Sequence, residues 1–591
     1  MRKASFLLTG ILVLGIALSP AAAGPKAPDK DPVAVGTRGA VSTVDPVATQ
    51  AGLAVLRNGG NAIDAAVAAA ATLGVTEPYS AGIGGGGFMV IHLAEDNRVV
   101  TIDGREDAPD DPQFDADVFN ERTSSFSDAV NSGLSVGTPG TLATWVEALD
   151  EYGTMSLAKM LEPAIRTARE GFAVDQTFAE QTEANLARFR QIAPTAKLFL
   201  DDGHVPKVGS RFRNVDLAHT YRLIARRGPD AFYGGPIAGD IVATVQDPPT
   251  TGSATEAWQP GLLTVNDLAT YEVLRPAPTR SQFRGYDIYG MPPPSSGGIT
   301  VGETLNIMEG FAADTPAVPF WHRYLEASAL AFADRNAYIG DDRYVDVPQT
   351  GLLSDGFAAD RRERIGAEAL AKPVAAGDPC PYEPGGCGSV ARATAGAPGE
   401  STTHLVTSDR WGNVVSYTLT IEATGGSAIT VPGRGFLLNN ELTDFNFTGP
   451  SPNLAAPGKR PRSSMSPTIV LSDGEPLLAV GSPGGSTIIT TVAQILLLRL
   501  DRGLSLPEAI AAPRATQRNT TAVQAEPGFL AAYASALENR GHTFTSIPEI
   551  GAATGLELLS DGSVLAAAEP VRRGGGDAGV VKPVRSTRND P

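Results

Sequence analysis

Cysteine is nearly absent from this chain, in which only Cys380 and Cys387 occur. Two thiols cannot build a disulfide-dense scaffold, and no histidine lies near them in the sequence to complete a metal site. Both stand in one stretch rich in proline and glycine, so in an oxidising compartment they would close a small surface loop. A disulfide is therefore favoured over a metal site, and two unpaired thiols are the remaining alternative.

Histidine and the common catalytic motifs are scarce as well. The 6 histidines are scattered without metal-ligand spacing, and neither H-E-x-x-H nor G-x-S-x-G occurs. Residues 82–87 formally match G-x-G-x-x-G, but Glu77-Pro78 precedes them and a strand pattern follows. A dinucleotide fingerprint instead follows a strand and opens a helix. We expect no metal and no cofactor, and we interpret these glycines as a tight backbone crossing in a sheet.

Positive charge is in deficit, with 47 Lys and Arg against 65 Asp and Glu and a formal net charge of −18. This balance argues against a nucleic-acid partner. Hydrophobic residues make up 42% of the chain and charged residues 19%, which predicts a folded protein with a well-buried core. A chain of 591 residues can hold several domains or one large multi-layer domain.

The apolar run at the N-terminus, residues 6–18, is short for a membrane span. A basic start precedes it and Ala21-Ala22-Ala23 follows, which is the pattern of a secretory signal peptide over residues 1–23. The pattern predicts a secreted or periplasmic bacterial protein without a stable membrane anchor. An uncleaved anchor is the alternative.

The rest of the chain divides into a helical part and a strand-rich part. Asp45-Pro46 and Asn61 each begin a helix, and residues 140–370 are mostly helical in pattern. Residues 369–401 lack periodicity and are dense in Gly, Pro and Ala, which predicts an exposed connector that is easily cut. From Thr402 onward we expect strands over 403–408, 414–421, 429–438, 467–472 and 476–481, helices over 487–500 and 506–512, and a frayed tail from residue 572.

The most informative segment joins these two parts at Ser401 and Thr402. Cleavage between them would free an α-amino group beside a hydroxyl, giving an N-terminal threonine nucleophile with a built-in base. The strands on either side of the turn at 409–413 form a hairpin, and a turn centred on Trp411 places Thr402 opposite Thr420. Glu422 projects from the same face as Thr420, so a carboxylate lies close to both hydroxyls. An exposed, Thr-rich strand pair without catalytic role is the alternative.

Two further segments favour the catalytic interpretation. Gly484 and Gly485 stand just before a predicted helix, where free backbone N–H groups can form an oxyanion hole. A plain helix cap is the alternative. Ser463 and Ser464 place paired hydroxyls beside basic residues, which suits a carboxylate ligand but also an ordinary polar loop.

A series of short motifs runs in order along nearly the whole mature chain, at residues 59–66, 84–89, 103–106, 137–140, 291–298, 402–404, 438–445, 462–468 and 481–485. In this order they resemble the γ-glutamyltransferase family of N-terminal nucleophile hydrolases. The resemblance implies an α+β fold, a four-layer αββα sandwich, made as one precursor. Self-cleavage between Ser401 and Thr402 would give a large subunit, 24–401, and a small catalytic subunit, 402–591.

The resemblance also implies a role for each matching residue. Thr402 would be the nucleophile and Thr420 the hydroxyl that orients it, with Gly484 and Gly485 as the oxyanion hole. The groups expected to hold the α-carboxylate of the substrate are Arg105, Ser463 and Ser464. The groups expected to hold its α-ammonium are Glu441 and Asp444. The partners implied are γ-glutamyl donors, with water or an amine as acceptor, and the two subunits of the one precursor.

Two positions depart from the family pattern. Glu422 stands where a neutral Asn or Ser is expected, and it could still bind an ammonium group. Residues 446–458 are short and Pro-rich where several members carry a longer lid, so an open site that favours hydrolysis over transfer is expected.

Two rival functions remain. A cephalosporin or glutaryl acylase of the same fold would act on acyl groups that lack the amino group, and retention of Glu441 and Asp444 argues against it. A catalytically silent secreted binding protein would not need the set formed by Thr402, Thr420 and Arg105.

Overall fold

The computed structural model of this protein describes residues 28–387 and 401–584. The predicted signal peptide, residues 1–23, lies outside the described residues. Residues 388–400 of the predicted connector also lie outside them. Among the described residues, no helix combines the length and apolarity needed to cross a membrane.

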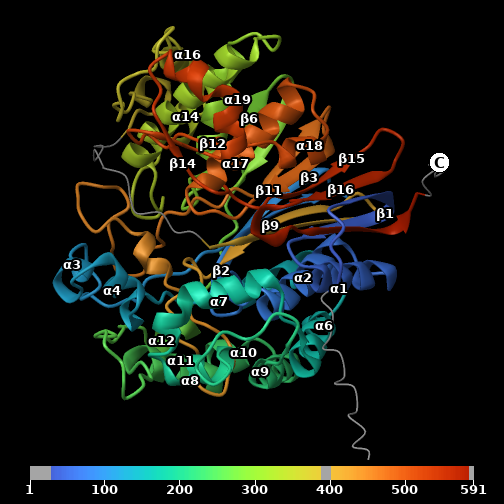
Figure 1. Cartoon of the computed structure of the whole chain (residues 1–591), viewed down its shortest axis with the longest axis vertical. Coiled ribbons are helices and arrows are strands. Elements are labelled where there is room, and N and C mark those ends of the chain that lie inside the picture. The colour runs from blue at the N-terminus through green and yellow to red at the C-terminus, as the bar shows by residue number, and fades with distance from the viewer. Residues whose placement is uncertain (1–27, 388–400, 585–591) are drawn as a thin grey trace, which may run out of the picture.

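One continuous path of hydrogen-bonded strands runs through the centre of the molecule (Figure 1). Strand β17 (Asp577–Pro583) lies off this path and pairs with β1. In order across the path, the strands are β3 (Arg98–Gly104), β2 (Gly86–Leu93), β9 (Val414–Thr420), β8 (Thr403–Asp409), β1 (Val33–Thr43), β16 (Val564–Ala568), β15 (Thr554–Leu558), β11 (Glu475–Gly481), β10 (Thr468–Ser472), β7 (Tyr286–Gly290) and β6 (Thr279–Phe283).

Strand β1 joins the two halves of this path. Its residues 33–36 pair with β16, and its residues 39–42 pair with β8. Between these two stretches the register against β17 shifts, and Arg38 and Gly39 adopt positive φ angles of 71° and 114°. An irregularity of this kind bends a strand and increases its twist. The path therefore folds over on itself, and β8 and β9 pack against β15 and β11 as two layers.

Helices cover the outer face of each sheet layer, which completes the αββα sandwich expected from the resemblance (Figure 1). On one side lie α1 (Pro46–Arg57), α2 (Ala62–Thr76) and α5 (Thr141–Tyr152), backed by α6 (Leu157–Glu170) and α9 (Val215–Arg227). On the other side lie α13 (Gly297–Glu309), α14 (Ala317–Tyr338), α17 (Thr487–Leu496), α18 (Leu506–Ala511) and α19 (Pro527–Glu538).

The remaining elements are short or peripheral. They are α3 (Val118–Arg122), α4 (Phe126–Val130), α7 (Gln176–Phe189), α8 (Ala193–Phe199), α10 (Asp230–Tyr233), α11 (Pro236–Gln246), α12 (Val265–Ala269), α15 (Gln349–Leu352), α16 (Asp355–Arg362), β4 (Phe172–Ala173), β5 (Arg211–Phe212), β12 (Ala515–Thr516), β13 (Val523–Ala525) and β14 (Phe544–Ser546).

The side chains of β2 point alternately to the two faces of the sheet, so this strand contributes to two hydrophobic cores. Successive side chains of a strand point to opposite faces. Met89 and Ile91 pack into the cluster around α1 and α2, whereas Phe88 and Val90 pack into the cluster between the sheets and the helices of the other side. Every residue of β2 is buried, so its apolar run reads as a central strand covered on both faces.

The predicted helix starts are confirmed. The Asp45 side chain accepts hydrogen bonds from the Val47 and Ala48 amides, and Asn61 and Asp64 form a capping box at α2. The glycines before β2 are packed against backbone, as predicted. A Cβ on Gly84 would lie 2.0 Å from the Leu437 carbonyl oxygen, and one on Gly85 would lie 2.0 Å from that of Thr420.

Two predicted elements are wrong. Residues 429–438 form no strand beyond the single bridge between Thr430 and Leu437, because Gly433 and Gly435 turn the chain with positive φ angles of 69° and 75°. Residues 140–370 are mostly helical, as predicted, although strands β6 and β7 lie among the helices. The tail from residue 572 is ordered as far as β17, which pairs with β1.

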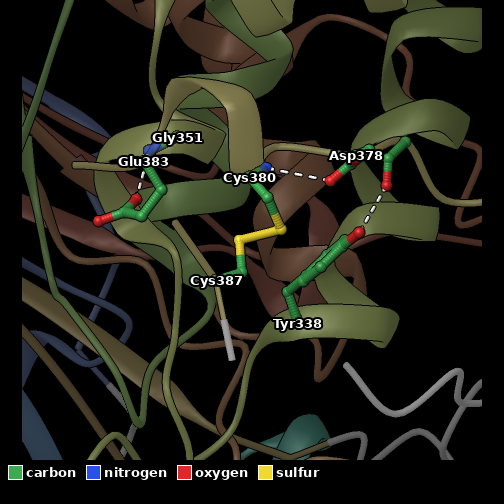
Figure 2. The surroundings of a disulfide bond; sticks show 7 residues. Tyr338, Gly351, Asp378, Cys380, Glu383 and Cys387 are labelled. Carbon is green, nitrogen blue, oxygen red and sulfur yellow. Dashed lines mark hydrogen bonds between the residues drawn. A yellow bond between two sulfur atoms is a disulfide. The ribbon is translucent and has the colours of Figure 1, made fainter. Parts of the chain in front are cut away.

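Cys380 and Cys387 are joined by a disulfide in the structure, with their Cα atoms 5.0 Å apart (Figure 2). The loop between them is held to the body of the molecule by the Glu383 carboxylate, which accepts a hydrogen bond of 2.6 Å from the Gly351 amide. Asp378 accepts a hydrogen bond of 3.1 Å from the Cys380 amide. The disulfide thus closes a small loop at the end of the segment that leads toward residue 401.

Candidate active site

One recess brings together nearly all the residues that the sequence singles out. It is lined by Arg105, Arg335, Thr402, Thr420, Glu422, Glu441, Asp444, Arg462, Ser463, Ser464, Met465, Gly485, Ser486 and Ile488. Of the predicted site residues, Gly484 lines an adjoining hollow instead. Residues from both sides of the predicted cleavage point contribute, because Arg105 follows β3 while Thr402 precedes β8.

The hairpin of β8 and β9 has the predicted register. Thr403 pairs with Leu419 and His404 with Thr418, so Thr402 and Thr420 stand at the open end of the ladder. The Thr402 hydroxyl donates to the Thr420 hydroxyl over 3.3 Å. Both threonine side chains are buried.

The peptide bond between Ser401 and Thr402 is held in place by several hydrogen bonds. The Thr420 hydroxyl donates to the Ser401 carbonyl oxygen over 2.8 Å, and the Ser401 amide donates to the Glu422 carbonyl oxygen over 3.0 Å. The Ser401 hydroxyl lies 2.7 Å from the Ser80 hydroxyl. The bond that would be cut is therefore fixed on both sides, and its carbonyl is polarised by the neighbouring threonine.

Arg105 is clamped between two carboxylates at the other end of the recess. Its guanidinium donates to Glu441, and its Nη2 atom donates to Asp444 Oδ2 over 2.5 Å. Its Nε donates to the Pro461 carbonyl oxygen over 3.0 Å. Burial alone lowers the pKa of Arg105, but the charges of Glu441 and Asp444 outweigh it and hold that pKa above its ordinary value. One cation and two anions thus face the recess together.

Acidic groups outnumber the cation they surround. Glu106 lies 4.0 Å from Arg105 and is fully buried. Burial, and then the charge of Glu441, raise the pKa of Glu106 well above its ordinary value. Burial also raises the pKa of Glu441 to about 7, with Arg105 opposing and Asp444 adding to the shift. Part of this cluster is therefore protonated near neutral pH.

Glu422 is a further buried acid in the lining of the recess. Its φ angle is 76°, which is rare for a residue with a side chain. Its amide donates to the Thr420 hydroxyl over 2.8 Å, and its carboxyl group accepts from the Asn440 side chain. Burial and then the charges of Asp444 and Glu441 raise its pKa well above the ordinary value. The neutral form of the Glu422 carboxyl group is therefore favoured relative to an exposed glutamate.

The paired serines occupy different settings. The Ser463 hydroxyl accepts from the Met465 amide over 3.1 Å, and the Ser464 hydroxyl accepts from Arg335 Nη2 over 2.7 Å. Sequence reasoning missed Arg335, since it lies within α14 with no motif around it. Arg462 was signalled only as one of the basic residues beside the serines.

Gly484 and Gly485 precede α17 and have φ angles of 133° and 54°. A Cβ on Gly484 would lie 2.6 Å from the Thr487 hydroxyl oxygen, so a larger residue does not fit there. Within the described part of the chain, neither glycine amide donates to another group. Free N–H groups at a helix start can stabilise a developing oxyanion.

None of the residues 446–458 lines the recess. Asn453 ties this segment down, because its side chain donates to the Asp444 carbonyl oxygen over 2.7 Å and accepts from the Arg462 amide over 2.7 Å. Lys459 donates to the Pro452 and Leu454 carbonyl oxygens over 2.8 and 2.9 Å.

Away from the recess, the fold brings together two histidines that are far apart in the sequence. His322 Nδ1 lies 2.8 Å from His542 Nε2, with Glu326 beside them. The Lys372 ammonium group contacts both Glu326 oxygens at 2.8 Å, so the charge of this carboxylate is met by lysine. This cluster links α14 to the segment after α19.

The four-layer sandwich, with a buried threonine just before a central strand and a glycine turn beside it, defines the class of N-terminal nucleophile hydrolases. The chain belongs to the gamma-glutamyltranspeptidase family, whose sequence model matches residues 48–579. It is therefore an enzyme with hydrolase or transferase activity.

Individual relatives agree with this family. The chain is 40% identical over 524 residues to the glutathione hydrolase proenzyme of Bacillus subtilis (strain 168), covering 87% of each chain. It is 35% identical over 584 residues to the glutathione hydrolase proenzyme of Escherichia coli (strain K12), covering 93% of this chain and 94% of the relative. Its fold is similar to the crystal structure of cephalosporin acylase from Bacillus halodurans, with a TM-score of 0.81, 29% identity and coverage of 96% and 99%.

Proposed function

We propose that the enzyme cleaves γ-glutamyl amide bonds, such as that of glutathione, through a γ-glutamyl ester on Thr402. The group then passes to water or to the amine of an amino acid or peptide. The observation that carries this proposal is the grouping of Arg105, Glu441 and Asp444 in the same recess as the hydroxyls of Thr402 and Thr420. A γ-glutamyl group has a carboxylate and an ammonium at one end and the reactive carbonyl at the other, which matches this arrangement.

Maturation is the first reaction in this proposal. The Thr402 hydroxyl oxygen attacks the Ser401 carbonyl carbon, while Thr420 donates to the carbonyl oxygen. The bond from that carbon to the Thr402 nitrogen breaks, and the nitrogen takes up the hydroxyl proton. Water then hydrolyses the resulting ester, which leaves a carboxylate on Ser401 and restores the Thr402 hydroxyl. The products are a large subunit of residues 24–401 and a small subunit of residues 402–591.

Catalysis uses the amine that maturation frees. An α-amino group has a pKa of about 8, so at neutral pH it can accept the proton of the Thr402 hydroxyl as that oxygen attacks the γ-carbonyl carbon. The Gly484 and Gly485 amides donate to the oxyanion that forms. The amine returns its proton to the leaving nitrogen, and the amide bond breaks.

Substrate recognition divides between charges of opposite sign. Arg105, with Ser463 and Ser464, receives the α-carboxylate, and Glu441 and Asp444 receive the α-ammonium. Arg105 pairs with Glu441 and Asp444 in the structure, so a bound zwitterion would exchange these ion pairs for pairs with its own charges. Glu422, whose pKa is raised by burial, adds a further hydrogen-bonding group to this end of the recess.

Two features of the setting belong to the same proposal. Residues 1–23 direct secretion or transport to the periplasm, where the disulfide of Cys380 and Cys387 is stable. Because residues 446–458 do not line the recess, we expect it to admit water readily, so that hydrolysis outweighs transfer. The ratio of glutamate to transferred product, measured with and without a dipeptide acceptor, tests the second feature, and dominant transfer would contradict it.

The decisive test combines mass and activity. Denaturing intact-mass analysis of the wild-type protein should give two chains, with the smaller beginning at Thr402, and the protein should release glutamate from glutathione. Thr402→Ala should stay uncut and inactive, whereas Thr402→Ser, which keeps a hydroxyl, should still be cut.

A cephalosporin or glutaryl acylase activity is the second candidate, favoured by the likeness to the Bacillus halodurans structure. Side-by-side assays with glutaryl and γ-glutamyl anilides separate the two functions. Turnover of the glutaryl compound at an equal or higher rate would replace γ-glutamyl specificity with acylase activity.

A further inference from the structure

Two buried arginines of the recess differ from the other buried arginines of the protein. Within residues 28–387 and 401–584, the buried arginines are Arg105, Arg335, Arg361, Arg460, Arg462, Arg514 and Arg572. All but two of them form ion pairs with carboxylates. The exceptions, Arg335 and Arg462, are both in the lining of the recess.

Arg335 is held by neutral groups alone. Its Nε donates to the Ser296 hydroxyl over 2.8 Å, its Nη1 to the Asn336 side chain over 3.0 Å, and its Nη2 to the Ser464 hydroxyl over 2.7 Å. These bonds fix the guanidinium plane and point one edge at Ser464 in the recess. They satisfy donors but supply no negative charge.

Arg462 donates hydrogen bonds to the C-terminal end of α14, and one of its N–H groups has no acceptor among the described residues. Its Nη1 donates to the carbonyl oxygens of Arg335 and Ile339 over 3.4 and 3.1 Å, where the helix presents its negative end. Its Nε is buried, and within the described residues that atom has no hydrogen-bond partner. A buried charged donor without a partner is costly, and such groups are normally completed by a ligand or an ion pair.

The two guanidinium groups also disfavour each other. Burial, followed by the charge of Arg462, lowers the pKa of Arg335 well below its ordinary value, and burial lowers that of Arg462 to about 10. Asp444 opposes both shifts, but its carboxylate already accepts from Arg105. This side of the recess therefore carries positive charge that no carboxylate of the described chain meets within 4.0 Å.

We infer that Arg335 and Arg462, with the Ser464 hydroxyl between them and the recess, form a second carboxylate-binding subsite beside Arg105. Because Arg105 is neutralised by Glu441 and Asp444, the net attraction for a substrate carboxylate comes from this pair. The inference rests on the proposed function, since a γ-glutamyl compound supplies the carboxylate. That carboxylate is either the α-carboxylate of the donor or one on the group beyond the scissile amide, as in γ-glutamylglutamate.

Three donors distinguish these sources in steady-state assays of the processed enzyme. γ-Glutamyl-p-nitroanilide carries the α-carboxylate alone, γ-glutamylglutamate adds carboxylates on the leaving group, and 4-aminobutyryl-p-nitroanilide has none. For Arg462→Leu we expect KM to rise at least about tenfold with the first two donors, with kcat changed less than about threefold. The same variant should leave the carboxylate-free donor unaffected.

The pattern of losses decides the outcome. A loss shared by the first two donors assigns the subsite to the α-carboxylate, and a loss confined to γ-glutamylglutamate assigns it to the leaving group. No loss with either donor, or an equal loss with all three, overturns the inference. Arg462→Lys, which keeps the charge, should recover part of the affinity, and Arg335→Lys tests the other cation in a variant that retains its charge.

Two controls keep the inference separate from the proposed function. Arg410→Leu removes an exposed arginine at the far end of the β8–β9 hairpin and should behave as wild type. Calorimetric titration of L-glutamate measures binding without turnover. If the wild type fails to turn over γ-glutamyl-p-nitroanilide, the proposed function fails, but weaker glutamate binding by Arg462→Leu still supports the subsite. Equal glutamate binding by both proteins, together with an unchanged KM for γ-glutamylglutamate, contradicts it.

Discussion

The Thr420 hydroxyl lies 2.8 Å from the Ser401 carbonyl oxygen and also receives the hydrogen bond of the Thr402 hydroxyl. A single group therefore contacts both the carbonyl to be attacked and the atom that would attack it. Its position is fixed by the end of β9 and by the Glu422 amide, which donates to it. The geometry required for maturation is thus present in the uncut chain.

Loss of the Thr420 hydroxyl should slow maturation. Thr420→Val keeps the shape of the side chain but removes the donor to the Ser401 carbonyl, and the loss of one such donor costs about 10²-fold or more in rate. We expect uncut precursor to accumulate over a time course followed by denaturing electrophoresis. Thr420→Ser is the matched control and should be cut at a rate closer to wild type. Equal cutting of the valine variant would show that Thr420 plays no part.

Glu441 should give donor binding a pH dependence near neutrality. Its pKa of about 7 means that it gains a proton as the pH falls from 8 to 6, and the neutral acid attracts an ammonium group less strongly. KM for a γ-glutamyl donor should therefore rise as the pH falls, by up to about tenfold over this range. Glu441→Gln should raise KM at pH 8 and flatten its dependence. KM is the quantity to compare between the two proteins, because kcat also depends on the protonation of the Thr402 α-amino group.

Glu422 should lower stability at alkaline pH. Its folded-state pKa is raised by burial and by its acidic neighbours, so its contribution to stability is present at low pH, where the folded and unfolded states both hold the proton. That contribution is lost as the pH rises, because only the unfolded state ionises freely. Glu422→Gln should therefore show a smaller fall in Tm than wild type between pH 5 and 9. Parallel curves for the two proteins would mean that Glu422 is ionised in the folded state.

The disulfide should affect stability but not chemistry. Closing a loop of this length stabilises by roughly 2 kcal/mol in the chain-entropy description. Replacing both Cys380 and Cys387 with Ser should lower Tm by a few degrees and leave kcat for a γ-glutamyl donor within about twofold. A large loss of activity in correctly folded, fully cut protein would show that the loop also shapes the recess.

Local patterns were sufficient to predict the centre of the site. The opposition of Thr402 and Thr420 follows from the symmetry of one turn, and the helix starts at Asp45 and Asn61 follow from their capping side chains. These features depend on residues that are close together in the sequence, so local sequence patterns are enough to predict them.

Long-range contacts could not be predicted in the same way. Arg335 reaches the recess only because α14 packs beneath Ser464, and no periodic pattern in the helix marks it. Strand β17 pairs with β1, and the two strands lie at opposite ends of the chain. No local pattern signals such a pairing, so the tail from residue 572 was predicted to be frayed. Residues 429–438 have strand-forming composition, but the glycines at 433 and 435 turn the backbone before a ladder can form.

Strands β8 and β9 lie between β2 and β1, so the segment after the cut is inserted into the segment before it. Cutting at Ser401 consequently divides the polypeptide without creating two bodies that can drift apart. Separating the pieces would require opening a central ladder on both sides, which amounts to denaturation. The cut enzyme should therefore unfold in one cooperative transition, and neither fragment should retain this architecture by itself.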